Sequence, residues 1–152
     1  MKQRIDATKV APEAYRAMAQ LQGYVEHSGL DKKIVHLVKV RASQINGCAY
    51  CIDMHTKEAR HDGETEQRLY GLNAWRETPY YSDKERAALA WAESLTEIAK
   101  THAPDDVYEE ASRHFTEKEL VDLSLAIVAI NGWNRLVIGF RVEPGTYKVA
   151  AK

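Results

Sequence analysis

The sequence has 152 residues, 45% of them hydrophobic and 28% charged, which is typical of a folded globular chain and excludes one that is largely disordered. Lysine and arginine number 21 and aspartate and glutamate 22, so the net charge of -1 gives no electrostatic reason to expect nucleic acid or an anionic membrane as a partner. The length favours one domain over residues 1–152. Two cysteines are too few for a disulfide scaffold.

No segment has the pattern of a targeting signal or of a membrane span. The first six residues lack the apolar stretch of a signal peptide. Polar residues interrupt the most apolar region, residues 120–140, which is therefore expected to form a buried helix and not a span. We expect a cytoplasmic protein, and in that compartment a close pair of cysteines is more often redox-active or metal-binding than structural.

Apolar residues recur at helical spacing along most of the chain, which predicts an all-α fold. In the first half, the expected helices cover residues 11–27, 31–45, 48–61 and 64–72. Gly47 and Gly63 end two of them, because glycine tolerates the left-handed backbone that closes a helix. A loop is expected over residues 75–81, since the residue before Pro79 avoids the helical region.

Two capping boxes mark helix starts in the second half of the chain. Ser82 pairs with Glu85, and Thr116 with Glu119; in each box the hydroxyl accepts one backbone N–H and the glutamate reaches back to another. The first box opens a helix with an apolar face that is predicted to hold Ala88, Trp91, Ala92, Leu95, Ile98 and Ala99. A shorter helix is expected over residues 105–114, and an irregular tail, free to fray, after residue 140.

The last predicted helix carries more apolar side chains than one small core can cover. They are Leu120, Val121, Leu123, Leu125, Ile127, Val128, Ile130, Trp133, Leu136, Val137 and Ile138. A helix that is hydrophobic on all sides is buried on all sides. We therefore predict an obligate homo-oligomer in which another subunit covers this helix or its neighbours.

Both cysteines lie in one motif, Cys48-Ala-Tyr-Cys51, which His55 follows. Side chains three or four residues apart are neighbours on a helix, with Cβ atoms about 5–6 Å apart, so the three share one face and the two thiols can form a disulfide. The break at Asn46-Gly47 places Cys48 at the start of a helix, where the dipole and a nearby imidazole favour a thiolate. The pattern predicts a dithiol that cycles to a disulfide, with a local base.

Two other interpretations of the motif stay open. The cysteines would be merely structural if both were inert in a core. Zinc would bind Cys48, Cys51 and His55, with His61 or His36 as the fourth ligand. A thioredoxin-type site needs a βαβ unit, which the pattern lacks. From position alone, in an apolar run, His36 is more typical of a hydrogen-bonded core residue than of a catalytic one.

These residues resemble the alkylhydroperoxidase (AhpD-like) and carboxymuconolactone decarboxylase family, whose pattern is an acidic residue, a helix and then Cys-x-x-Cys-x-x-x-His. Cys48, Cys51 and His55 match it, and the similarity extends over residues 37–47, 75–79, 87–91 and 130–136. The chain departs from the pattern at two positions. His36 stands where the family has its acidic residue, and Tyr50 stands between the cysteines, where some members have a histidine.

The resemblance implies a helical trimer or hexamer and a thiol-dependent peroxidase with no metal or flavin cofactor. Cys51 would attack a hydroperoxide, Cys48 would resolve the sulfenic acid as a disulfide, and His55 would belong to a proton relay. A dithiol reductant, such as a lipoylated protein, would restore the thiols. As a neutral imidazole, His36 would take the proton that a carboxylate takes in the family, and Tyr50 would donate a hydrogen bond.

Two further functions are kept as alternatives. A cofactor-free lactone decarboxylase is the other activity of this superfamily, but it needs bases and an electrophilic pocket and has no use for a dithiol. A non-enzymatic redox sensor would use the same disulfide to change its assembly.

Overall fold

The computed structural model describes residues 2–149, and within that range every regular element is helical. The first half holds α1 (Ala7–Val10), α2 (Pro12–His27), α3 (Lys32–Asn46), α4 (Ala49–His61), α5 (Glu66–Tyr70) and the 3-10 helix η1 (Leu72–Glu77). The second half holds α6 (Asp83–Thr96), α7 (Ile98–Thr101), α8 (Asp105–His114) and α9 (Glu117–Phe140). The predicted all-α fold is confirmed, as are both capping boxes, at Ser82 and at Thr116.

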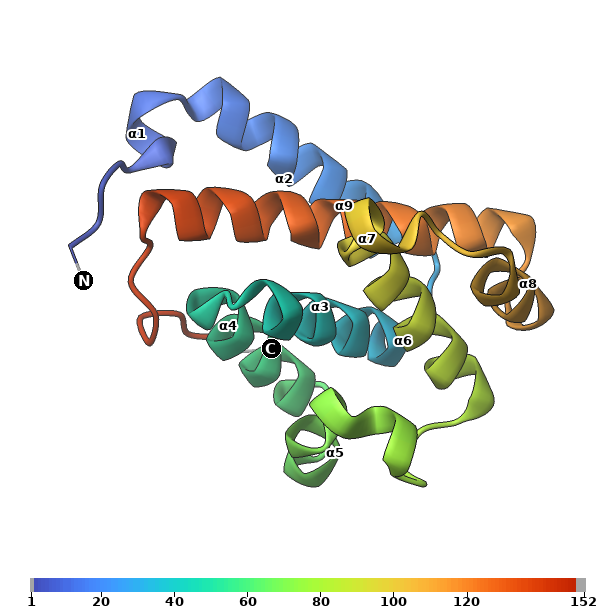
Figure 1. Cartoon of the computed structure of the whole chain (residues 1–152). Coiled ribbons are helices and arrows are strands. Elements are labelled where there is room, and N and C mark those ends of the chain that lie inside the picture. Colours follow the sequence, from blue (N-terminus) through green and yellow to red (C-terminus); the bar gives the residue numbers. More distant parts are fainter. Residues whose placement is uncertain (1, 150–152) are drawn as a thin grey trace.

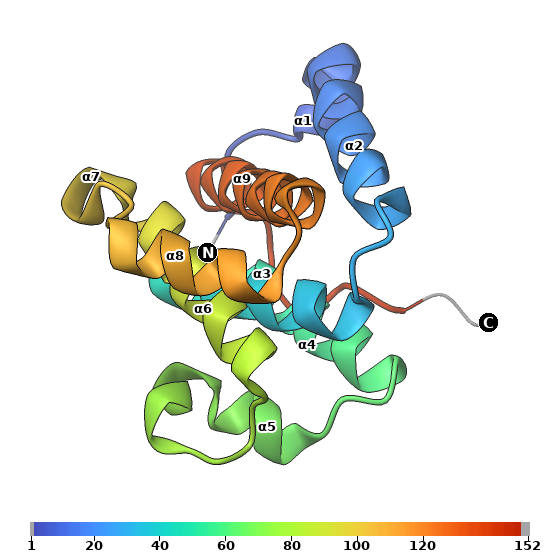
Figure 2. The same ribbon diagram turned by 90° about the vertical axis from the view of Figure 1, so that its right-hand side faces the viewer.

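Helix α9 runs through the middle of the structure, with α2 packed on one side of it and α3 and α6 on the other (Figure 1). Figure 2 shows the same order of layers after the quarter turn, with α5 at the opposite end of the molecule from α2. Helix α3 contacts α4, α6 and α9, so it is the element that fixes the start of α4 against the centre of the fold.

The buried apolar side chains form two large clusters and one small one. The first joins α3, α6, α8 and α9, and the second joins α3 and α6 to α4, α5 and η1. The small cluster consists of Ala42, Cys48, Cys51 and Ile130, with Val137 packed against it. The cysteine pair is therefore built into the contact of the α3–α4 corner with α9.

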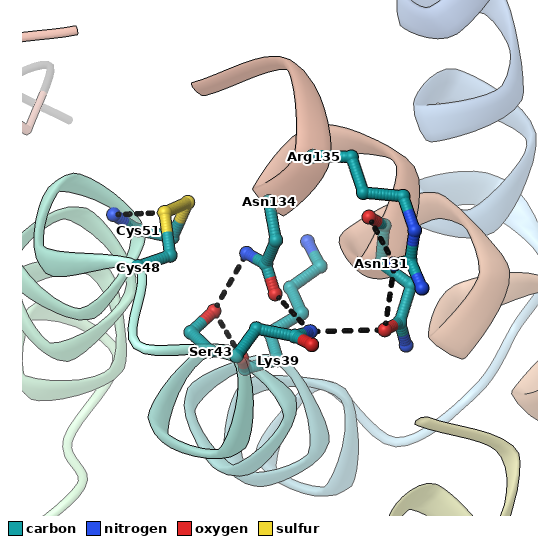
Figure 3. Close-up of a disulfide and its surroundings, with 8 residues drawn as sticks. Lys39, Ser43, Cys48, Cys51, Asn131, Asn134 and Arg135 are labelled. Carbon is teal, nitrogen blue, oxygen red and sulfur yellow. Dashed lines mark hydrogen bonds between the residues drawn. A yellow bond between two sulfur atoms is a disulfide. The ribbon is translucent and has the colours of Figure 1, made fainter. Parts of the chain in front are cut away.

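A buried polar network joins α3 to α9 directly beside that small cluster (Figure 3). The Asn134 amide donates to Ser43 Oγ at 3.1 Å, and its carbonyl accepts from Asn46 Nδ2 at 2.8 Å. Asn46 Nδ2 also donates to Asn131 Oδ1 at 2.9 Å, and Asn131 in turn donates to Thr96 Oγ1 at 3.0 Å. Paired polar groups inside a core fix one relative placement of two helices, because any shift leaves a buried group unsatisfied.

We expect Asn134→Ala to lower the free energy of unfolding by about 1–3 kcal/mol, because Ser43 and Asn46 each lose a buried partner. Urea unfolding followed by far-UV circular dichroism measures the change. Asn73→Ala is the matched control, since Asn73 is exposed on η1. Equal stability of the two variants would contradict a structural role for the network.

Two boundaries differ from the sequence prediction. The expected loop over residues 75–81 begins as the 3-10 helix η1, because Trp75 is buried and Arg86 donates to the carbonyls of Trp75 and Thr78. The helix opened by Ser82 ends at Thr96, so the expected apolar face does not continue. Ile98 and Ala99 lie beyond the end of α6 and are exposed.

Helix α9 is covered by the chain on only part of its surface. Among the described helices, it alone is long and apolar enough to meet a length-and-composition test for a membrane span, a test that core helices also pass. Its buried polar residues are hydrogen-bonded within the fold, as expected of a core helix. Val121, Val128 and Ile138 remain exposed, so the excess of apolar residues is real and the oligomer stays a prediction.

The described part of the tail after α9 is irregular, as predicted, and it is hydrogen-bonded to α4. The backbone N–H of Gly145 donates to Asp53 Oδ2 at 3.2 Å, and Lys57 Nζ donates to the carbonyl of Tyr147 at 3.1 Å. These bonds hold the tail along α4, the helix that carries Cys51.

Candidate functional site

The α3–α4 corner sets the position of both cysteines. Gly47 has a φ of 70° and ends α3, as predicted from the sequence. The N–H of Cys48 then donates to the Ser43 carbonyl at 2.9 Å. Cys48 is the N-cap of α4, so Cys51 lies in the first turn. Unpaired N–H groups and the positive end of the dipole meet at this point, which stabilises a thiolate once the pair is reduced.

Cys48 and Cys51 are joined by a disulfide with Cα atoms 5.3 Å apart (Figure 3). The backbone N–H of Cys51 also donates to Cys48 Sγ at 3.3 Å. Cys48 is 0% exposed and Cys51 is 3% exposed. Cys51 lines a cavity that Cys48 does not line, so a small molecule in that cavity would meet Cys51 and not Cys48.

The cavity beside Cys51 has a volume of about 480 Å³. One part of its wall is apolar and aromatic and comes mainly from α2 and α9, including Tyr15, Trp133, Leu136, Val137 and Phe140. The other part is polar and comes from α3, α4 and the tail, including Lys39, His55, Glu58 and Tyr147. An apolar chamber with a few convergent polar groups is the usual form of a small-molecule site.

His55 lies one turn after Cys51 on the same cavity wall, as predicted, and is buried. Its Nδ1 is 2.8 Å from Glu58 Oε2. A carboxylate only accepts, so Nδ1 carries the proton and Nε2 of the neutral ring keeps its lone pair. Burial lowers the pKa of His55, and the Glu58 carboxylate only partly offsets this, so the ring is neutral at neutral pH. A neutral imidazole with a free Nε2 is able to accept a proton.

Glu58 is held at both of its oxygens. Oε2 faces His55, and Oε1 accepts from the Tyr147 hydroxyl at 2.7 Å. Burial by itself would raise the pKa of Glu58, but the hydrogen bonds from His55 and Tyr147 outweigh it and leave that pKa below its usual value. The carboxylate is therefore ionised at neutral pH and orients the imidazole.

Lys39 brings a cation into the same polar wall and is only 5% exposed. Burial lowers the pKa of its ammonium group, and the negative charges of Glu58 and Glu26 oppose that shift. The side chain lies on α3, one turn before Ser43 (Figure 3). The polar wall thus brings together the amine of Lys39, the imidazole of His55 and the carboxylate of Glu58, and Glu26 of α2 lines the same cavity.

The remaining two candidate residues are placed differently from each other. Tyr50 lines the Cys51 cavity, and burial raises the pKa of its phenol, so it is a donor at neutral pH. His36 lies outside that cavity and instead lines a neighbouring one of about 450 Å³. Its Nε2 is 3.0 Å from Asp62 Oδ2. The two cavities share Lys39 and Glu58, so polar side chains separate His36 from Cys51.

The zinc interpretation finds no matching geometry in the part of the chain that the structure describes. Over residues 2–149, no group of three or more His, Cys, Asp or Glu side chains is arranged to hold a metal ion.

Sequence reasoning missed three members of this site. Glu58 follows Cys51 by seven residues, a spacing that returns to the same face of a helix, so this signal was available. Lys39 lies one turn after His36 in an apolar run, which is a weaker signal. Tyr147 comes from an irregular tail, where no local periodicity points to any contact.

Comparisons with known proteins find similar sequences and similar folds. An uncharacterized protein of Bacillus subtilis, YdfG, is 45% identical over 138 residues, which are 91% of this chain and 94% of that protein. A crystal structure from Agrobacterium tumefaciens matches with a TM-score of 0.93 and 49% identity, covering 96% of this chain and 100% of the other. That protein is of unknown function, with antioxidant defence as an AhpD protein suggested for it.

A more distant structure shows the same fold. An uncharacterized peroxidase-related protein of Ralstonia eutropha, described as an alkylhydroperoxidase AhpD core, matches with a TM-score of 0.80 at 18% identity, covering 92% of this chain and 75% of the other. The model of the carboxymuconolactone decarboxylase family matches residues 12–94, the segment that contains α2, α3, the cysteine pair and most of α6. With more than half of its length matched by that model and a 45% identical relative of similar size, the chain belongs to the carboxymuconolactone decarboxylase family and has its AhpD-like fold.

Proposed function

We propose that the protein is a thiol-dependent peroxidase that reduces organic hydroperoxides with the Cys48–Cys51 pair. One observation carries the proposal: Cys51 and His55 share the wall of an apolar cavity, while the bonded partner Cys48 is fully buried next to Cys51. A peroxidatic thiol must meet the substrate, and a resolving thiol has only to meet the first sulfur. Because Cys51 lines the cavity and Cys48 does not, this arrangement supports Cys51 for the first role and Cys48 for the second.

In the first step, the Cys51 thiolate attacks the outer oxygen of the hydroperoxide. The O–O bond breaks, Cys51 becomes a sulfenic acid, and the substrate leaves as an alkoxide that takes up one proton to form an alcohol. The Cys48 thiol then attacks the sulfenic sulfur, forms the disulfide and releases water. Two electrons pass from the dithiol to the peroxide, and an external dithiol returns them by exchange through a mixed disulfide.

His55 supplies the proton transfers. As a neutral base it takes the proton of the Cys51 thiol, and as an imidazolium it returns that proton to the leaving alkoxide. Glu58 keeps Nδ1 protonated and stabilises the charged ring. In this scheme Tyr50 is a hydrogen-bond donor to the substrate, whereas His36, which lines the neighbouring cavity, is assigned no step.

The cavity wall and the exposed side of α9 also suggest the substrate class and the assembly of the protein. The apolar wall from α2 and α9 favours an organic hydroperoxide over hydrogen peroxide, because burial of a hydrocarbon group adds binding energy. We place the protein in the cytoplasm, where reductants keep thiols reduced, and as a homo-oligomer, a trimer or hexamer, that covers the exposed side of α9. The reductant is a dithiol; a lipoylated protein is the proposed source.

Thiol counting on the reduced protein tests the proposal. One equivalent of cumene hydroperoxide should consume two thiols and release one equivalent of cumyl alcohol, and the intact mass should fall by two hydrogens with no oxygen added. Protein treated with cumyl alcohol alone is the control. Two thiols that persist after exposure to the peroxide would contradict the proposed function.

The Cys48–Cys51 pair also helps to decide between the peroxidase and the two alternative functions, a lactone decarboxylase and a redox sensor. A lactone decarboxylase has no step for a dithiol, so a disulfide at the cavity favours peroxide reduction. A redox sensor would show a change of oligomeric mass on oxidation without sustained turnover, which the same samples reveal by light scattering.

A further inference from the structure

The hydroxyl of Tyr147 is the only donor, apart from His55, that the structure places on the Glu58 carboxylate among the described residues. Each carboxylate oxygen therefore has one partner, His55 on Oε2 and Tyr147 on Oε1. Two bonds in different directions fix the rotation of a carboxylate, whereas one bond leaves it free to turn. The orientation of His55 thus depends on a residue far from α4 in the sequence.

The tail that delivers Tyr147 is itself anchored to the helix that carries Cys51. Asp53 accepts from the Gly145 N–H, and Lys57 donates to the Tyr147 carbonyl, while a 2.8 Å ion pair joins Lys57 to Asp53. Gly145 has a φ of 89°, a left-handed conformation that glycine adopts without strain, and it turns the chain toward α4. The backbone at Tyr147 is held independently of its hydroxyl.

A competing charge lies in the same wall. The buried Lys39 ammonium lines the same cavity as the partly buried Glu58 and the exposed Glu26, and its charge interacts with both carboxylates. Attraction between opposite charges is stronger in a buried setting than in water, so Glu58 is drawn toward Lys39 as well as toward His55. If Oε1 lost its donor, the carboxylate would be free to rotate toward the lysine and release Nδ1 of the imidazole.

We propose that Tyr147 is a positioning residue, which holds Glu58 against the pull of Lys39 and so keeps His55 in the tautomer that leaves Nε2 free for the Cys51 thiol. The described part of the C-terminal tail is then a component of the active site and not merely its cover. The expected effect on peroxide turnover rests on the proposed function, whereas the expected effect on the His55 tautomer does not.

Tyr147→Phe is the direct test, because it removes the hydroxyl and keeps the ring. Two-bond proton–nitrogen correlation spectra of isotope-labelled protein report the tautomer of each histidine, and a His55→Gln spectrum assigns the signal. Above the ordinary histidine pKa of about 6.5, the unaltered protein should show His55 as a single Nδ1–H tautomer. The variant should show a mixture. A single Nδ1–H tautomer in the variant would overturn the proposal.

Kinetics provide the second readout. In Tyr147→Phe, kcat for cumene hydroperoxide should fall about tenfold, the factor that one net hydrogen bond supplies, while KM stays unchanged. In a Glu58→Gln background the same change should have no further effect, since the hydroxyl acts through Glu58. Equal losses in both backgrounds, or an unchanged kcat, would overturn the role of Tyr147.

The control variant is Tyr80→Phe, because Tyr80 is exposed and its hydroxyl takes part in no hydrogen bond among residues 2–149. It should leave both kcat and the His55 tautomer unchanged. If the unaltered protein does not turn over peroxide at all, the proposed function fails, and the tautomer spectra still decide whether Tyr147 positions Glu58.

Discussion

Replacing Cys51 with serine is expected to abolish hydroperoxide turnover, whereas replacing Cys48 with serine should leave one stoichiometric reaction. Cys51 lines the cavity and Cys48 does not, so only Cys51 is placed to attack a substrate. Without Cys48, the sulfenic acid on Cys51 has no neighbouring thiol with which to form a disulfide. Stopped-flow peroxide consumption and intact mass distinguish the two variants.

The intact masses after peroxide treatment distinguish the two variants. Peroxide-treated Cys48→Ser protein should gain one oxygen, which a sulfenic-acid trapping reagent captures, and should release one equivalent of alcohol before it stops. Cys51→Ser protein should gain nothing. The reverse pattern, with oxygen added to Cys48 in the Cys51→Ser protein, would show that the cavity beside Cys51 is not the entry point of the peroxide. Full turnover by either variant would remove the disulfide from the cycle.

Removal of the imidazole should have the next largest effect. We expect His55→Ala to lower the rate of peroxide reduction by about 10²–10⁴, the usual contribution of a positioned acid or base. His61→Ala is the matched control, because His61 lies at the end of α4, is exposed, and does not line the Cys51 cavity. Equal rates for the unaltered protein and His55→Ala would exclude His55 from the mechanism.

The pH dependence follows from the direction of the His55 shift. Burial lowers the pKa of His55 below its ordinary value of 6.5. The ring therefore becomes protonated, and stops acting as a base, only when the pH falls below this lowered pKa. Glu58 raises the pKa of His55, and Glu58→Gln should therefore move the acid limb to still lower pH while it lowers the plateau rate. A limb that stays in place in this variant would contradict the coupling of the two residues.

The cysteine motif shows how far local reasoning reaches. Helical spacing placed Cys51 and His55 on one face, and the glycine at position 47 ended α3 so that Cys48 became the N-cap of α4. These features depend only on bonds within one or two turns. The same reasoning extended to Glu58 would have found the partner of His55, because its spacing from Cys51 is also helical.

Elsewhere, packing overrode local preference. The segment before Pro79 folds into the 3-10 helix η1, since Trp75 is buried and Arg86 satisfies the carbonyls around it. The apolar face of α6 stops at Thr96, and Ile98 is exposed beyond it. Apolar periodicity predicts which residues share a face as long as the helix continues. The residue at which the helix ends also depends on contacts with residues that are distant in the sequence.

By itself, then, the sequence of this protein determined an all-helical chain with a reducible cysteine pair at a helix start and an imidazole one turn away, because spacing and capping act over a few residues. Only the tertiary structure decided which cysteine faces a cavity, that His36 lies outside it, and that Lys39 and Tyr147 join the site. Those residues come from α3 and from the tail, and they meet α4 only when helices packed around α9 bring them together. Contacts of that kind arise from long-range packing, which leaves no periodic mark on the sequence.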